Sequence, residues 1–200
     1  MRIARLAVAL FLLAGPAALA AEQPLPVPPP TDWLKQADLY GQVARMGPAQ
    51  DAQVIDWSLA HQRLVSSGFL FDLSRRLLAA GRTHDALEWY AIALMRGHYD
   101  AGRCQDRSAK RAVGGLARQA AVVARYGNSH AQEFGDAGMK ALARDDLFGH
   151  TVSPDWICAQ GLTGMGGQSA GTIPPNLWDA VALSVREEFT QQFGQMSGRN

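Results

Sequence analysis

The chain has 200 residues, of which 48% are hydrophobic and 18% are charged. This composition excludes a wholly disordered or fibrous protein and is typical of a globular one. The signal peptide predicted below contains Arg2 and Arg5, so the mature chain keeps 17 basic side chains against 18 acidic ones and lacks the basic excess expected of a nucleic-acid-binding protein.

The first twenty residues have the three parts of a secretory signal peptide. These parts are the basic residues Arg2 and Arg5, the apolar residues 6–14, and the small-x-small site Ala18-Leu19-Ala20. The alternative is a membrane anchor, but the apolar run is interrupted by Gly15-Pro16 and is shorter than the roughly 20 residues of a spanning helix. We expect residues 1–20 to be removed after Ala20, which gives a periplasmic or secreted protein, and no later segment is predicted to span a membrane.

Proline dominates the segment that follows the predicted cleavage site. Five of the seven residues 24–30 are proline, which removes backbone donors and favours an extended polyproline II conformation. Residues 21–30 are therefore predicted to be a semi-rigid spacer; a proline-rich ligand for a partner is the alternative. Residues 31–200 are then long enough for one folded domain.

Apolar residues recur at helical spacing along this domain, and no run alternates with the period of two expected of a strand. Seven helices are predicted. They begin at Thr31 or Asp32, at Asp51, near Leu70, at Thr83, at Ser108, at Ser129 and at Asn176. Helix ends are predicted at Gly47-Pro48, Ser66-Ser67-Gly68, Gly81, Gly97 and Gly127-Asn128. The expected fold class is all-α, and the short glycine-bounded connections favour antiparallel helical hairpins.

Residues 70–98 combine large, small and aromatic side chains at the spacing of two packed helices. Leu70 and Leu73 are the large residues of the first helix, Gly81 lies in the turn, and Ala86, Tyr90 and Ala93 are the small, aromatic and small residues of the second. This segment resembles one tetratricopeptide (TPR) unit, or the related Sel1-like repeat. It departs from the TPR pattern at Ser74, Leu77 and His98.

A shift of 34 residues gives partial support for a second unit. Gly47 and Ala52 correspond to Gly81 and Ala86, and Leu39 corresponds to Leu73, whereas Asp56 falls where Tyr90 would be expected. The resemblance therefore covers residues 36–98. Two such units cannot bury a core alone, so an unrelated helical bundle is the alternative.

Cys104 and Cys158 are the two cysteines of the chain. An even pair in an exported protein predicts a disulfide, which would stabilise the fold by about 4 kcal/mol in the chain-entropy model. It would tie the end of one hairpin to the region around Asp155-Trp156-Ile157. Two buried free thiols, or a redox-active pair without a Cys-x-x-Cys motif, are the alternatives.

One catalytic pattern occurs in the glycine-rich loop predicted over residues 161–173. Gly167-Gln168-Ser169-Ala170-Gly171 fits the G-x-S-x-G nucleophile elbow of α/β-hydrolases. The elbow requires a strand before the serine, but the preceding segment is too rich in glycine, and no histidine follows residue 150. The loop also contains no lysine for a phosphate-binding P-loop. We therefore interpret this segment as a connecting loop.

No other motif predicts a catalyst, a metal site or a cofactor. The histidines at positions 61, 84, 98, 130 and 150 have no metal-ligand spacing. An envelope enzyme that acts on cell-wall material would need a positioned acid. The candidate acids, Glu88, Glu133, Glu187 and Glu188, fall on helix faces where solvent exposure is the simpler interpretation.

The leading hypothesis is an exported, non-enzymatic helical-repeat protein that binds a protein or peptide partner in the cell envelope. Stacked hairpins create a concave surface suited to such binding. Trp57, Trp89 and Tyr90 are the candidate partner-binding residues, although a place in the core or in a groove is the simpler interpretation for Trp57 and Trp89. The second hypothesis is the cell-wall enzyme with an unidentified acidic catalyst, and the third is a structural envelope protein without a defined groove.

Overall fold

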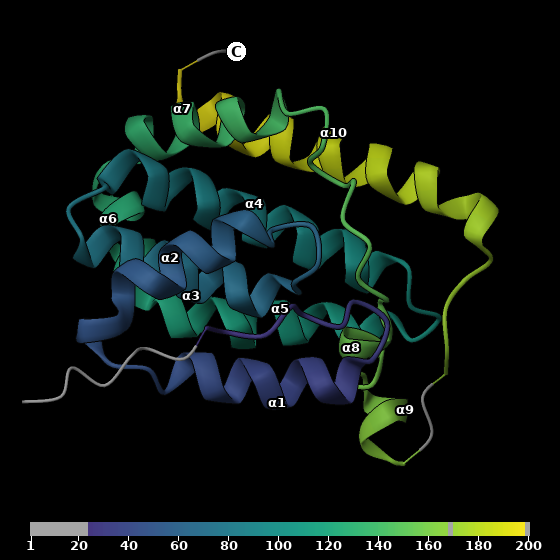
Figure 1. The fold of residues 1–200 in the computed structure, drawn as a ribbon. Coiled ribbons are helices and arrows are strands. Elements are labelled where there is room, and N and C mark those ends of the chain that lie inside the picture. Colours follow the sequence, from purple (N-terminus) through teal and green to yellow (C-terminus); the bar gives the residue numbers. More distant parts are fainter. Residues whose placement is uncertain (1–23, 168–169, 199–200) are drawn as a thin grey trace, which may run out of the picture.

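A computed structural model describes residues 24–167 and 170–198, and the regular secondary structure in these ranges is helical (Figure 1). An isolated bridge between Cys104 and Thr172 is the one extended pairing recorded for them. The predicted all-α class is therefore confirmed. The predicted signal peptide, residues 1–20, lies outside the described residues. Among the helices described, none combines the length and apolarity of a membrane-crossing segment.

Most of the connections between successive helices are short, and residues 143–154, between α7 and α8, form a long one. The α-helices are α1 (Trp33–Ala44), α2 (Asp51–Ala60), α3 (Ser67–Ala79), α4 (Thr83–Gly102), α5 (Lys110–Ala117), α6 (Ala121–Ser129), α7 (Ala131–Leu142), α8 (Asp155–Cys158), α9 (Leu162–Met165) and α10 (Trp178–Met196). Four short 3₁₀ turns accompany them: η1 (Pro48–Gln50), η2 (Arg107–Ala109), η3 (Arg118–Ala120) and η4 (Pro175–Leu177).

Two helix ends show how the local sequence sets the boundaries. The Asp32 carboxylate accepts a hydrogen bond of 3.1 Å from the backbone N–H of Lys35 and caps α1. At the end of α3, Gly81 adopts a φ of 76°, and the N–H groups of Gly81 and Arg82 donate back to the carbonyls of Leu78 and Leu77. This pair of bonds is the Schellman motif, which requires a left-handed residue. Both predicted boundaries are confirmed.

Gly97 does not end α4 as predicted, because the helix continues to Gly102. A Cβ atom at Gly97 would lie 3.0 Å from Val113 and 3.1 Å from the Ser67 hydroxyl. The glycine therefore serves close packing of α4 against α3 and α5 rather than helix termination. Ser67 and Gly68, predicted to lie at the end of the second helix, instead begin α3.

The single helix predicted over residues 108–128 is also wrong, since the segment is divided into α5, η3 and α6. All three pieces contact α3, so the bend at η3 wraps the segment around that helix. Val113, Ala120 and Val123 are the buried residues that the bend keeps against the core.

The core is built around α3 and α4, which share the most extensive contact between any two elements described. Their fully buried side chains include Phe69, Leu70, Phe71, Leu73, Leu77, Leu87, Ile92 and Met95. Figure 1 shows α7 and α10 covering one side of this pair, while α1 lies on the opposite side with α5 behind it. The contacts of α4 with α7 and α10, and of α3 with α1 and α5, agree with this layering.

Of the predicted spacer, residues 21–30, the first three residues lie outside the described part of the chain, and residues 24–30 lie against the domain. Pro28 is buried, and Leu25 packs against the hydrophobic core. The Trp57 indole N–H donates to the Pro26 carbonyl at 3.0 Å, and the Ser153 backbone N–H donates to the Pro30 carbonyl at 3.0 Å. The proline-rich segment is thus a strap that lies on the fold, and we refer to residues 24–30 as the strap.

Candidate binding groove

A groove with a volume of about 360 Å³ separates α1 from α5. The beginning of α3 forms its floor, and α8 with the residues after it forms one end. Its lining is apolar and aromatic, with a few amide and hydroxyl groups. The lining residues are Trp33, Gln36, Ala37, Tyr40, Ser66, Gly68, Ala112, Gly115, Leu116, Trp156 and Gln160.

The α1 wall follows from helical spacing. Trp33, Ala37 and Tyr40 are separated by four and three residues, which places them on one face of the helix. Leu39 and Val43 lie on a different face and are buried in the core. The helix therefore carries more apolar surface than the core uses, and its second apolar face borders the groove.

The polar groups of the α1 wall are held in place by hydrogen bonds. The Gln36 amide donates to the Leu64 carbonyl at 2.7 Å and accepts from the Ser66 N–H at 3.2 Å. The Tyr40 ring packs edge-to-face on Phe69, with 5.1 Å between ring centroids, and its hydroxyl donates to the Gln119 amide oxygen.

Small residues keep the groove open opposite α1. Ala112 and Gly115 are on the α5 side, next to Leu116, and Gly68 forms the floor. A Cβ atom at Gly68 would lie 3.6 Å from the Tyr40 ring and 3.7 Å from Leu116. A larger side chain on this floor or on the α5 wall would therefore occupy the groove.

The Trp156 end of the groove is fixed by a buried polar cluster around Asp100. The Asp100 carboxylate accepts hydrogen bonds from the Trp156 indole N–H at 2.9 Å and from His150 Nε2 at 2.7 Å, and it forms an ion pair with Arg103. Burial acts to raise the pKa of Asp100, but the His150, Arg103 and Trp156 contacts outweigh it and hold the pKa below its ordinary value. The cluster therefore retains a charged carboxylate in the protein interior.

The predicted disulfide between Cys104 and Cys158 is confirmed, and it lies beside this cluster. It joins the residues after α4 to the end of α8, two positions after Trp156. The Arg103 guanidinium stacks between the Tyr99 and Trp178 rings, 4.4 and 4.6 Å from their centroids. These contacts fix Trp156 relative to α4 and α10, so this end of the groove is preformed.

The lining contains no Asp, Glu, Lys, Arg or His side chain. Tyr40 is its titratable group, and burial together with the nearby Asp72 charge raises the pKa of Tyr40 to about 12. The groove therefore stays uncharged at neutral pH. It suits an uncharged apolar or aromatic group, and its lining offers no general acid or base of suitable pKa.

The three residues predicted to bind a partner lie elsewhere and are buried. Trp57, Trp89 and Tyr90 are 8%, 7% and 6% exposed. Trp57 packs against Phe69 and the strap. They form no common exposed surface, because each is enclosed by neighbouring helices.

Tyr90 and Trp89 point to different neighbours. Tyr90 lies between the Phe71 and Phe134 rings, with centroid distances of 5.4 and 5.9 Å. Trp89 lies under the Arg144 guanidinium at 5.3 Å. The aromatic residues that do border a groove are Trp33, Tyr40 and Trp156. For Trp33 and Tyr40, the feature of the sequence that could have indicated this role is the second apolar face of α1.

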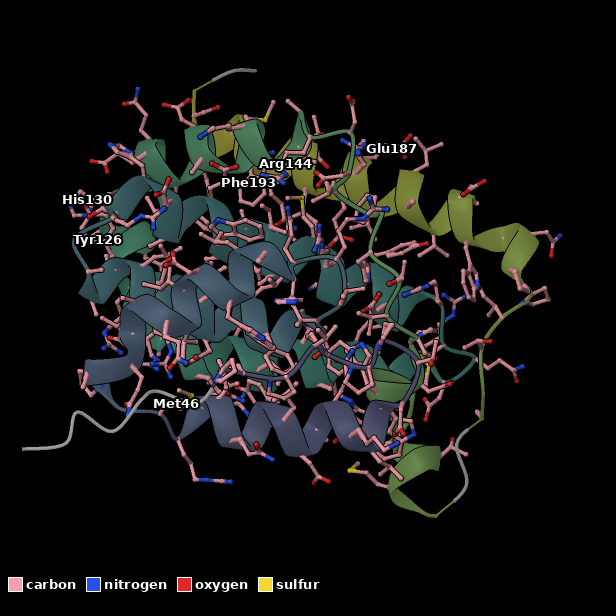
Figure 2. The ribbon with its side chains drawn as sticks, viewed as in Figure 1. Met46, Tyr126, His130, Arg144, Glu187 and Phe193 are labelled. Atoms are coloured by element: carbon pink, nitrogen blue, oxygen red, sulfur yellow. A yellow bond between two sulfur atoms is a disulfide. The ribbon has the colours of Figure 1, made fainter. Side chains whose placement is uncertain are left out.

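Two of the candidate acids meet at a second, smaller hollow of about 270 Å³. Glu88 and Glu133 line it with Asp136, His84 and Lys140. The Glu88 carboxylate forms ion pairs of 2.7 Å with Lys140 and 3.5 Å with Arg144. Arg144 is labelled in Figure 2. Glu88 is therefore engaged in ion pairs that join α4 to the end of α7 and the residues after it.

Of the remaining chemical candidates, Glu188 borders a third hollow of about 290 Å³ with the basic residues Arg107 and Lys110. Glu187 and Glu188 are exposed on α10, where Figure 2 labels Glu187. Gln168 and Ser169 of the G-x-S-x-G pattern lie outside the described residues, and the short helix α9, rather than a strand, comes before them. Within the part of the chain that is described, no group of three or more His, Cys, Asp or Glu side chains has a metal-binding arrangement.

Comparison of the chain with protein-family models, with curated proteins and with solved structures gave no significant match. The geometry of the groove is therefore the basis for a functional proposal.

Proposed function

We propose that the chain is an exported, non-enzymatic helical protein whose groove between α1 and α5 binds an apolar side chain of a protein or peptide partner. The observation that carries this proposal is an open, preformed, aromatic groove whose lining bears no charged side chain. We refer to it as the α1–α5 groove. The basic, apolar and small-residue parts of residues 1–20 support export.

The apolar groove favours a partner that inserts one large apolar or aromatic side chain as an anchor. Burial of one large apolar or aromatic side chain contributes about 1.5–3 kcal/mol, and such anchors carry most of the affinity at many interfaces. The disulfide and the Asp100 cluster already hold Trp156 in place. A preformed wall lowers the entropy lost on binding.

We also propose that α3 and α4, which contain Leu70 to Ala93, pack as one TPR-like or Sel1-like unit. These two helices share the most extensive contact between any two elements described, as the two helices of one repeat unit would, and α3 also lines the groove. Stacked helix pairs form a concave binding surface. Ala86 and Ala93 are fully buried, in keeping with small residues at a close helix contact.

A peptide-display selection tests the groove as a binding site. A library of random peptides is selected on the mature chain, and each enriched peptide is then measured against Ala112→Phe, which places a ring in the groove. Ala131→Phe, at the exposed start of α7, is the matched control.

We expect enriched peptides to share an apolar or aromatic residue and to bind Ala112→Phe at least tenfold more weakly than the wild type. The Ala131→Phe control should bind them as the wild type does. Equal binding to both variants, or a selection that enriches no peptide, would contradict the proposal. The intact mass of the chain recovered from the periplasm should correspond to a start at Ala21.

A further inference from the structure

The strap has the burial pattern of a bound polyproline II helix. That conformation has three residues per turn, so residues 25 and 28 lie on one face. Leu25 packs against the core and Pro28 is buried, whereas Pro24, Pro26 and Val27 are exposed. Val27 is 68% exposed. The inner face of the strap is thus Leu25 with Pro28.

The protein holds the strap through groups that contact its carbonyls. A proline-rich segment has few N–H donors, so a surface that recognises it must supply donors of its own. Here the Trp57 indole donates to Pro26 and the Ser153 backbone donates to Pro30. Trp57 is itself fixed by the Phe69 and His61 rings, at centroid distances of 5.8 and 5.2 Å.

An aromatic side chain and hydrogen-bond donors facing an extended proline-rich segment are the elements of polyproline II recognition. We infer that the surface beneath the strap, built from Trp57 and the Ser153 backbone, is a recognition site for proline-rich segments of other proteins. Residues 24–30 are its resident ligand. This site uses residues different from those of the α1–α5 groove, so the inference does not rest on the proposed function.

The tether between strap and domain determines how a second ligand would bind. A tethered segment competes at an effective concentration in the millimolar range. A proline-rich segment in trans must therefore displace the strap. Weakening the inner face of the strap should make the site accessible, whereas changes on its outer face should not.

The test uses the full mature chain and a synthetic peptide of residues 24–30 that carries a spin label at its amino end. Binding is followed as paramagnetic broadening of the Trp57 indole N–H resonance, which is assigned from a Trp57→Phe spectrum. Leu25→Ser with Pro28→Ser releases the strap. Pro24→Ser with Val27→Ser, on the exposed face, is the matched control.

We expect the peptide to broaden the Trp57 resonance selectively. The peptide concentration that gives half of the maximal broadening should be at least tenfold lower for the released variant than for the wild type or the control. A peptide with serine at the positions of Leu25 and Pro28 should produce no broadening. If the released variant does not fold, the same broadening is expected in the wild type at millimolar peptide.

Failure of the peptide to broaden the Trp57 resonance at millimolar concentration would overturn the inference. Equal broadening by the serine peptide would do the same, because recognition would then not involve the inner face. A released variant that forms dimers by strap exchange, and binds no peptide, would identify a second copy of the chain as the occupant and also overturn it.

Discussion

Arg76 and Arg96 are the largest side chains that are fully buried in the described residues, and both act as hydrogen-bonding centres. Arg96 donates to the carbonyls of Leu147 at 2.7 Å and Gln62 at 2.6 Å, which anchors two loops to α4. Burial lowers the pKa of Arg96 to about 10, so the guanidinium remains charged at neutral pH. Arg96 therefore fixes two loop segments that have no regular secondary structure to pair with.

Replacement of Arg76 should be strongly destabilising. Its guanidinium forms ion pairs with Asp72, at 2.6 Å, and with Asp51, and donates to the Val43 and Met46 carbonyls at 2.9 and 3.0 Å. Breaking a buried ion pair typically costs about 3–5 kcal/mol. Because Arg75 would still pair with Asp72 at 2.6 Å, we expect Arg76→Met to cost about 3 kcal/mol, the lower end of that range. The free energy of unfolding in urea measures the effect.

Arg82→Met is the matched control for that change. Arg82 forms an ion pair of 2.8 Å with Asp85, but both side chains are more than 40% exposed. Exposed pairs contribute about 0–1 kcal/mol. A similar loss of stability in the two variants would show that the buried network around Arg76 is not what stabilises the junction of α1, α2 and α3.

At the scale of elements, α7 and α10 approach each other through glycine. A Cβ atom at Gly138 would lie 2.3 Å from the Phe193 ring, and one at Gly135 would lie 2.5 Å from the Ser197 backbone nitrogen. Phe193, labelled in Figure 2, is buried and packs on Phe134 and Phe189. These glycines are therefore required by packing, although glycine lowers helix propensity.

Gly138→Ala should destabilise the protein, in spite of the gain of about 1 kcal/mol in helix propensity. Overpacking against the Phe193 ring typically costs about 1–3 kcal/mol, and that ring has little room to move. Gly114→Ala on α5 is the control, because its Cβ would meet nothing within 4 Å; it should stabilise by about 0.5–1 kcal/mol. Thermal unfolding followed by circular dichroism checks both, and stabilisation by Gly138→Ala would refute the packing argument.

Local sequence patterns predicted those features of the fold that depend on neighbouring residues. The Asp32 cap and the Gly81 turn could be predicted because each forms hydrogen bonds with residues close to it in the sequence. The helix end predicted at Gly97 was wrong because a glycine is needed there for close contact with Val113 of another helix. The packing of the strap on Trp57 depends in the same way on residues distant in the sequence.

The candidate groove, too, depends on contacts that local sequence patterns do not predict. Composition and spacing identify aromatic residues but do not distinguish one that fills the core, such as Tyr90, from one that borders a groove, such as Trp33. That distinction depends on which helices face each other. The α1–α5 groove exists because Gly68, Ala112 and Gly115 are small where α1, α3 and α5 meet, and only the fold places them together.

At the scale of the whole molecule, the disulfide links two segments that are 54 residues apart in the sequence. Both half-cystines are buried, at 0% and 1% exposure. The link and the Asp100 cluster hold α8, and with it Trp156, against the end of α4. Stability and the shape of the groove should therefore depend on the same bond.

Cys104→Ala with Cys158→Ala should lower the free energy of unfolding by about 4 kcal/mol, from the larger conformational entropy of the unfolded chain. Groove-selected peptides should also bind this variant more weakly than they bind Ala131→Phe, because Trp156 loses part of its support. In the wild type, thiol labelling after denaturation without reductant should find no free cysteine, and the native bond should resist dithiothreitol until urea unfolds the chain. Rapid reduction of the native protein, with peptide binding unchanged, would show that the bond is exposed and does not position the groove.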